Sequence, residues 1–165
     1  MSEQPSLPVD SDVEAAEETT GRQKPVHLSW TSIGLVAGGG MVGTGLRYAI
    51  TIWTPHWAGV PVATLAINVL GAFLLGVLLE LLAERSIDAG WSRRIRLAVG
   101  TGGLGGFTTY SALTNDAVTL FAVHEGRAVS YALGTVLLGA VASTAGIWLS
   151  RIHLHAAMVD GKDYP

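Results

Sequence analysis

Long apolar stretches alternate with short polar connections along most of the chain. Four of these stretches exceed 20 residues, at 30–52, 62–83, 95–121 and 129–150. A helix of about 20 apolar residues spans the hydrocarbon core of a bilayer, and a helix satisfies its own backbone hydrogen bonds there. The pattern therefore predicts an all-α membrane protein with four transmembrane helices.

The third stretch contains an unusual run of glycines. Residues 100–106 are Gly-Thr-Gly-Gly-Leu-Gly-Gly, and four residues with hydroxyl groups follow at 108–111. Each glycine costs a helix about 1 kcal/mol relative to alanine, and irregular backbone at membrane depth is tolerated where it is buried in protein or lines a cavity. We therefore predict that the third helix is broken at this glycine-rich segment. The alternative is that the glycines only allow close helix packing, as the spacing of Gly102 and Gly106 would.

Composition supports a membrane protein and sets the predicted boundaries. Of 165 residues, 49% are apolar and 14% are charged, with a mean hydropathy of +0.42, whereas a soluble domain is about 25% charged. Six of the 13 acidic residues lie in the first 18 positions. We predict a disordered acidic tail at 1–27, a membrane domain at 28–152 and a short C-terminal tail at 153–165. The absence of cysteine excludes disulfides and thiolate metal sites.

Lysine and arginine are distributed unevenly between the two sides of the predicted four-helix topology. Eight of them fall on one side, whereas Arg127 lies on the other, together with Arg47 if it reaches the surface. Cytoplasmic segments carry the excess of these residues, so the bias predicts that both termini face the cytoplasm. The eight residues are Arg22, Lys24, Arg85, Arg93, Arg94, Arg96, Arg151 and Lys162.

Few polar side chains fall within the apolar stretches, and each has a structural and a functional interpretation. Arg47 either snorkels to the surface or places a positive charge at the mouth of an anion path. Asn68 either holds two helices together or donates its amide to an anion. Asp116 needs a partner or water at its depth. Tyr131 and Thr135 share a helix face, where hydroxyls either contact neighbouring helices or replace water around an ion.

Three sequence blocks occur in order, one in each of the first three stretches. Residues 39–48 are Gly-Gly-Met-Val-Gly-x-x-x-Arg-Tyr, and residues 64–76 are Thr-Leu-x-x-Asn-x-x-Gly-x-Phe-x-x-Gly. Residues 102–111 are Gly-Gly-x-Gly-Gly-Phe-Thr-Thr-Tyr-Ser, the most specific of the three. Together the blocks resemble the CrcB/Fluc family of fluoride channels, and the resemblance covers about residues 33–150.

The resemblance implies a fluoride-specific channel rather than an enzyme, with fluoride leaving the cytoplasm passively down its gradient. Family members are antiparallel dimers of four-span subunits. The resemblance implies a structural Na⁺ at the dimer centre, held by backbone carbonyls of Gly105 and Thr108, and it places Arg47 at a pore mouth. Asp116 matches a family acid. The residues that the resemblance assigns to the fluoride pore are Asn68, Thr109, Tyr110, Ser111, Tyr131 and Thr135.

Two features depart from the family pattern. The family usually has two phenylalanines spaced by three in the third block, whereas this chain has Tyr110 and Leu113, and leucine has no aromatic edge to offer an anion. An antiparallel homodimer also needs a chain that inserts in both directions, which the strong Lys and Arg bias disfavours. We therefore favour a heterodimer with a related CrcB-like subunit over a homodimer.

Two other functions are compatible with a small apolar chain. A small multidrug-type exporter requires an acidic residue deep in the first span, and residues 30–52 contain none. A non-conducting membrane scaffold leaves the glycine run without an explanation. No basic face indicates nucleic-acid binding. The sequence therefore favours a fluoride channel in the plasma membrane.

Overall fold

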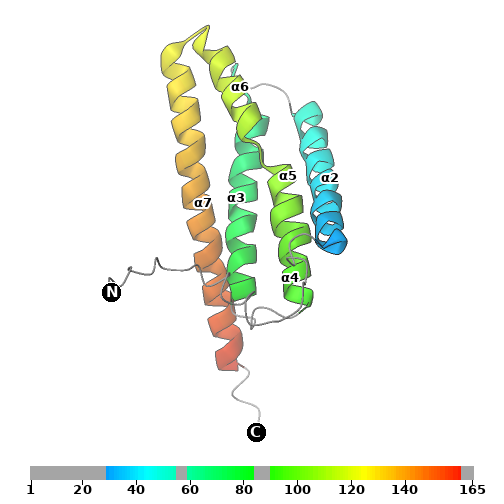
Figure 1. Cartoon of the computed structure of the whole chain (residues 1–165). Helices are drawn as coiled ribbons and strands as arrows, with labels where there is room; N and C mark the ends of the chain where they lie inside the picture. The colour runs from blue at the N-terminus through cyan, green and yellow to red at the C-terminus, as the bar shows by residue number, and fades with distance from the viewer. Residues whose placement is uncertain (1–28, 55–58, 84–89, 161–165) are drawn as a thin grey trace, which may run out of the picture.

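A computed structural model describes residues 29–54, 59–83 and 90–160 of the chain. The chain runs along α2 (Trp30–Trp53) and returns along α3 (Val62–Ala83) (Figure 1). It then crosses the bundle again through several shorter helical segments at 91–121, which we call the composite pass, and returns along α7 (Glu125–Asp160). The start of α2 and the end of α7 therefore lie at the same end of the bundle. The predicted acidic tail lies outside the described residues.

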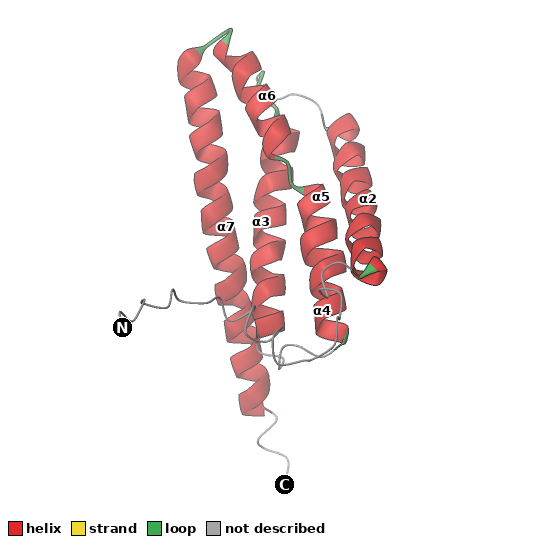
Figure 2. Cartoon of the chain, viewed as in Figure 1, coloured by secondary structure: helices red, strands yellow, loops and turns green. Residues whose placement is uncertain are grey.

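The composite pass consists of four consecutive segments. It begins with α4 (Trp91–Ile95), continues as a nine-residue π-helix, η2 (Arg96–Leu104), and α5 (Gly105–Phe107), and ends as α6 (Tyr110–Phe121). Figure 2 shows the helical ribbon interrupted between α5 and α6. Within the described part of the chain, α2, α3 and α7 are long and apolar enough to cross a membrane as single helices. The protein is an all-α membrane protein, as predicted.

The interruption lies just after the glycine run rather than within it, which corrects the predicted position. The extended residues are Thr108, with φ −73° and ψ 158°, and Thr109, with φ −151° and ψ 119°. Thr109 begins α6 as its N-cap, because its hydroxyl accepts a hydrogen bond from the N–H of Ala112 over 3.1 Å. The glycines stay helical because packing against α2 outweighs their low helix propensity.

A row of glycines lets α2 and the composite pass approach each other closely. A Cβ added at Gly43 would overlap the carbonyl oxygen of Gly103, and one added at Gly39 would overlap that of Ala98. Small residues permit such backbone contact between membrane helices. We call this contact the glycine seam, and its residues are Gly39, Gly43, Gly102 and Gly106.

Packing accounts for only part of the glycine run. A Cβ at Gly102 or Gly106 would lie 2.5 Å from a carbonyl oxygen of α2. A Cβ at Gly105, in contrast, would have no neighbouring atom within 4 Å. The packing interpretation is therefore confirmed for Gly102 and Gly106, whereas close packing does not require a glycine at position 105.

The last helix is longer than the fourth apolar stretch. It begins at Glu125 and continues to Asp160, so the predicted boundary at residue 152 falls inside a continuous helix. Residues 147–160 contain neither glycine nor proline, and Gly161 follows directly. A run without glycine or proline favours an uninterrupted helix.

Candidate functional site

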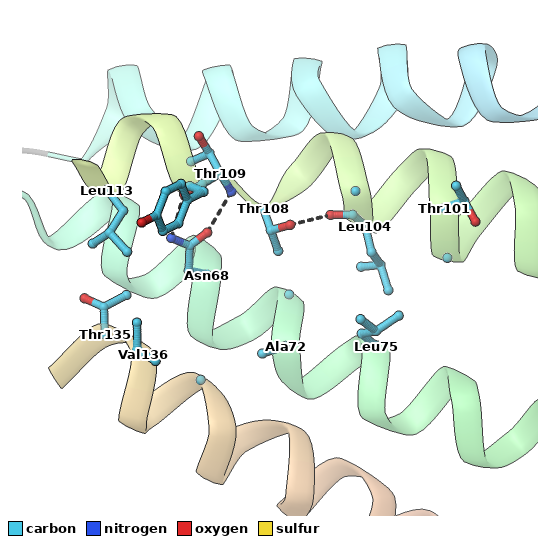
Figure 3. Close-up of a pocket in the computed structure, with 15 residues that line it drawn as sticks. Asn68, Ala72, Leu75, Thr101, Leu104, Thr108, Thr109, Leu113, Thr135 and Val136 are labelled. Atoms are coloured by element: carbon cyan, nitrogen blue, oxygen red, sulfur yellow. Dashed lines mark hydrogen bonds between the residues drawn. The ribbon is translucent and has the colours of Figure 1, made fainter. Parts of the chain in front are cut away.

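A cavity of about 440 Å³ lies between α3, the composite pass and α7. Figure 3 shows Asn68, Thr109 and Thr135 toward one end of this cavity and Leu75 and Leu104 toward the other. The remaining lining residues are mostly glycine, threonine and apolar residues. The cavity is thus apolar overall and has a few polar groups beside the interrupted segment, an arrangement typical of small-ligand sites.

Asn68 holds the interrupted segment in place. Its Nδ2 donates to the carbonyl of Thr109 over 2.9 Å, and its Oδ1 accepts from the N–H of Thr109 over 2.8 Å. The side-chain amide therefore satisfies both backbone groups of a residue that has left the helix. The amide NH₂ carries two hydrogens, so one remains for an anion. Asn68 can therefore hold two helices together and also donate to an anion, so the two interpretations left open by the sequence are compatible.

The hydroxyl groups near the interruption are engaged with the protein itself. Thr108 and Thr135 each donate to a carbonyl four residues earlier in the chain, over 2.9 and 2.7 Å. The hydroxyls of Thr109 and Ser111 share a hydrogen bond of 3.2 Å. A hydroxyl that donates to its own helix must rotate before it donates to an ion. Asn68 therefore offers a donor that needs no such exchange.

Four of the six side chains assigned to the pore line this one cavity, namely Asn68, Thr109, Tyr110 and Thr135. Ser111 and Tyr131 do not line it. Tyr110 is 80% exposed in the single subunit although it lines the cavity, whereas Leu113 is buried at the cavity wall. In a single subunit, most of the surface of Tyr110 is therefore uncovered and Leu113 is enclosed.

Asp116 has two hydroxyl partners from other helices. The hydroxyl of Thr64 donates to Asp116 Oδ2 over 2.6 Å, and the hydroxyl of Tyr131 lies 3.2 Å from the same oxygen. The Tyr131 hydroxyl also lies 3.3 Å from the carbonyl of Pro61. The sequence indicated that Asp116 needs a partner, but Thr64 lies 52 positions away, and only helix packing brings the two together.

Replacing Asp116 with alanine is expected to lower the free energy of unfolding by about 2 kcal/mol, because the hydroxyls of Thr64 and Tyr131 lose a shared acceptor. Asp116→Asn keeps an acceptor oxygen and should lose less. Thermal unfolding in detergent measures both variants, with Asn115→Ala, at an exposed neighbouring position, as the control. Equal melting temperatures for Asp116→Ala and the control would contradict the expected role.

Arg47 approaches the interrupted segment from α2, whereas the cavity lies toward α3 and α7. Its Nη1 donates to the carbonyl of Thr108 over 3.5 Å, and it is not a lining residue of the cavity. Within one chain, Arg47 therefore contacts a carbonyl released by the interruption. Its predicted place at a pore mouth stays a prediction.

Two backbone carbonyls at the interruption have the chemistry to hold Na⁺. Thr108 is extended, which takes its carbonyl out of the helical ladder. The Gly105 carbonyl loses its regular partner because the N–H of Thr109 donates to Asn68 instead. Carbonyl oxygens suit hard cations, although the guanidinium of Arg47 competes for the Thr108 oxygen. The two carbonyls therefore have suitable chemistry for a hard cation, and the Na⁺ site stays a prediction.

Known proteins resemble this chain over most of its length. Residues 34–147 match the family described as CrcB-like protein, Camphor Resistance (CrcB). The chain is 48% identical over 126 residues to fluoride-specific ion channel FluC 2 of Leifsonia xyli subsp. xyli, which covers 76% of this chain and 87% of the relative. It is 42% identical over 123 residues to fluoride-specific ion channel FluC of Agrobacterium fabrum, and the match covers 73% of this chain and 96% of the relative. It is 48% identical over 113 residues to fluoride-specific ion channel FluC 1 of Cutibacterium acnes, and the match covers 66% of this chain and 78% of the relative.

Proposed function

The chain belongs to the CrcB-like protein family and is a fluoride channel protein, and we propose that it exports cytoplasmic fluoride passively as one subunit of an antiparallel dimer. Its relatives are named fluoride-specific ion channels, which favours a channel over the exporter and the scaffold. The observation that carries the proposal is the cavity beside the interrupted pass, where Asn68 retains an amide hydrogen for an anion.

Fluoride holds its water strongly, so a selective path must replace that water with hydrogen-bond donors. In the proposed mechanism, Asn68 supplies the first donor without changing its contacts to Thr109. The hydroxyl of Thr135 then rotates away from the carbonyl of Tyr131 and toward the ion. The hydroxyl of Thr109 turns toward the ion from the hydrogen bond that it shares with Ser111. Each rotation adds one donor to fluoride, so donors replace water one at a time. Ser111 and Tyr131 extend the proposed path beyond this cavity.

The proposed dimer is a heterodimer with a related CrcB-like subunit. Tyr110 is 80% exposed, which suits a residue that contributes to a pore shared with a partner. Leu113 offers no aromatic edge, so the partner supplies the second aromatic group of the working pore. Na⁺, when bound by Gly105, Thr108 and the partner's equivalent carbonyls, would hold the two interrupted segments together.

We further propose that both termini face the cytoplasm. The start of α2 and the end of α7 lie at the same end of the bundle (Figure 1). The arginines at the start of the composite pass, Arg93, Arg94 and Arg96, belong to this end as well. Cytoplasmic loops carry such an excess of positive charge, which supports this orientation.

The chain reconstituted alone into liposomes is expected to release fluoride at no more than about one tenth of the rate of a mixture with a related subunit of opposite Lys and Arg bias. A fluoride electrode measures the efflux, and empty liposomes provide the baseline. Full efflux from the chain alone would overturn the heterodimer but leave the channel proposal intact. Baseline efflux from both samples would overturn the channel proposal itself.

A further inference from the structure

We propose that the end of α3 and the start of the composite pass form a binding site for the headgroup of an anionic phospholipid. This site is separate from the cavity beside Asn68, and the proposal does not rest on fluoride conduction. It rests on a second cavity, of about 240 Å³. The lining residues are Leu79, Leu82, Ala83, Ser92, Arg93 and Arg96.

Two guanidinium groups supply the positive charge of this cavity. Arg93 and Arg96 are three positions apart, so they share one face of the composite pass. Among the residues that the structure describes, no carboxylate forms an ion pair with either of them. The nearby acid Glu80 is held by Arg151, whose Nε lies 2.7 Å from Glu80 Oε1. Within the described ranges, the two guanidiniums are thus without a carboxylate partner and can contact an anion.

The cavity lies near the end of the bundle that carries two exposed tryptophans. Trp91 begins α4 and is 70% exposed, and Trp30 begins α2 at the same end of the bundle and is 84% exposed (Figure 1). Exposed tryptophans gather at the membrane–water interface, where lipid headgroups lie. Basic pockets between helices at this level bind anionic headgroups.

The two walls of the cavity differ in chemistry, which favours a lipid over a free anion. The α3 wall consists of Leu79, Leu82 and Ala83, which can contact the upper part of an acyl chain. The opposite wall offers Arg93, Arg96 and the hydroxyl of Ser92. Guanidinium binds phosphate through paired hydrogen bonds. A phosphate ester attached to an acyl chain satisfies both walls, whereas inorganic phosphate satisfies one.

Native mass spectrometry of the full chain, titrated with phosphatidylglycerol or phosphatidylcholine, tests the proposal. The double variant Arg93→Gln/Arg96→Gln is expected to bind phosphatidylglycerol about 30-fold more weakly, since each charge near a membrane surface contributes roughly a factor of five. Arg94→Gln is the matched control, because Arg94 lies on the same helix but does not line the cavity. Equal weakening by control and double variant would overturn the site.

Three further measurements separate a lipid from free phosphate and guard against misfolding. Leu82→Gln should weaken phosphatidylglycerol binding while both arginines remain, and 10 mM inorganic phosphate should not displace the lipid. Displacement by phosphate, or wild-type binding in Leu82→Gln, would overturn the lipid assignment. Arg93→Lys/Arg96→Lys keeps the charge but removes the paired hydrogen bonds, so intermediate binding is expected. Wild-type binding in both arginine double variants would overturn the proposal.

Discussion

Asn68→Asp is expected to reduce fluoride efflux by at least about 100-fold. The substitution keeps an oxygen that can accept from the N–H of Thr109, but it removes both amide hydrogens. It also places a negative charge beside the proposed fluoride path. Two like charges about 4 Å apart repel by about 4 kcal/mol at an effective dielectric constant of about 20, which corresponds to roughly 1,000-fold.

The matched control for this variant is Asn115→Asp, which makes the same chemical change at an exposed position of α6. Fluoride-electrode measurements on liposomes that contain the conducting dimer compare the two variants with the wild type. Each variant must first elute as the wild-type dimer does, because the new carboxylate faces the carbonyl of Thr109. Efflux within about threefold of wild type in Asn68→Asp would show that this amide does not contact the ion.

Gly43→Ala is expected to lower the free energy of unfolding by about 2–3 kcal/mol, even though alanine is the better helix former. The new methyl group would overlap the carbonyl oxygen of Gly103, which is backbone and cannot move alone. The two helices must therefore separate, and overpacking of this kind typically costs about 1–3 kcal/mol. A double variant with Gly39→Ala should destabilise the protein further, because both residues belong to the glycine seam.

Gly45→Ala provides the matched control, two positions along the same helix, where an added Cβ would have no atom within 4 Å. This variant should be neutral or slightly stabilising, because only helix propensity changes. Thermal unfolding in one detergent compares all variants, and the yield of monodisperse protein provides a second readout. Equal melting temperatures for Gly43→Ala and Gly45→Ala would contradict the close contact between α2 and the composite pass.

The structure of the glycine run could be predicted only in part from the residue pattern. Five glycines within residues 100–106 indicated either a break or close packing. Packing explains Gly102 and Gly106, and the extended backbone begins only at Thr108. The precise position could not be predicted because helix propensity is a weak preference that tertiary packing can override. The N-capping ability of Thr109 was a local signal for the start of α6.

The residues of the candidate site could also be predicted only in part. The polar residue types in otherwise apolar stretches identified Asn68, Asp116 and Thr135 as positions of interest. Their partners could not be predicted, because Thr109 lies 41 positions from Asn68 and Thr64 lies 52 positions from Asp116. Such pairs form only when particular helix faces meet, and no local periodicity encodes which faces those are.

The sequence by itself determined that this protein is helical and lies in a membrane, because hydropathy and the need for internal backbone hydrogen bonds act along each segment separately. Its three residue blocks also indicated the fluoride channel family, which the comparison with known proteins confirmed. Only the tertiary structure decided where the composite pass is interrupted and that Asn68 binds both backbone groups of Thr109. The physical reason is that a backbone group released from a helix must find a partner, and the partner here comes from another helix.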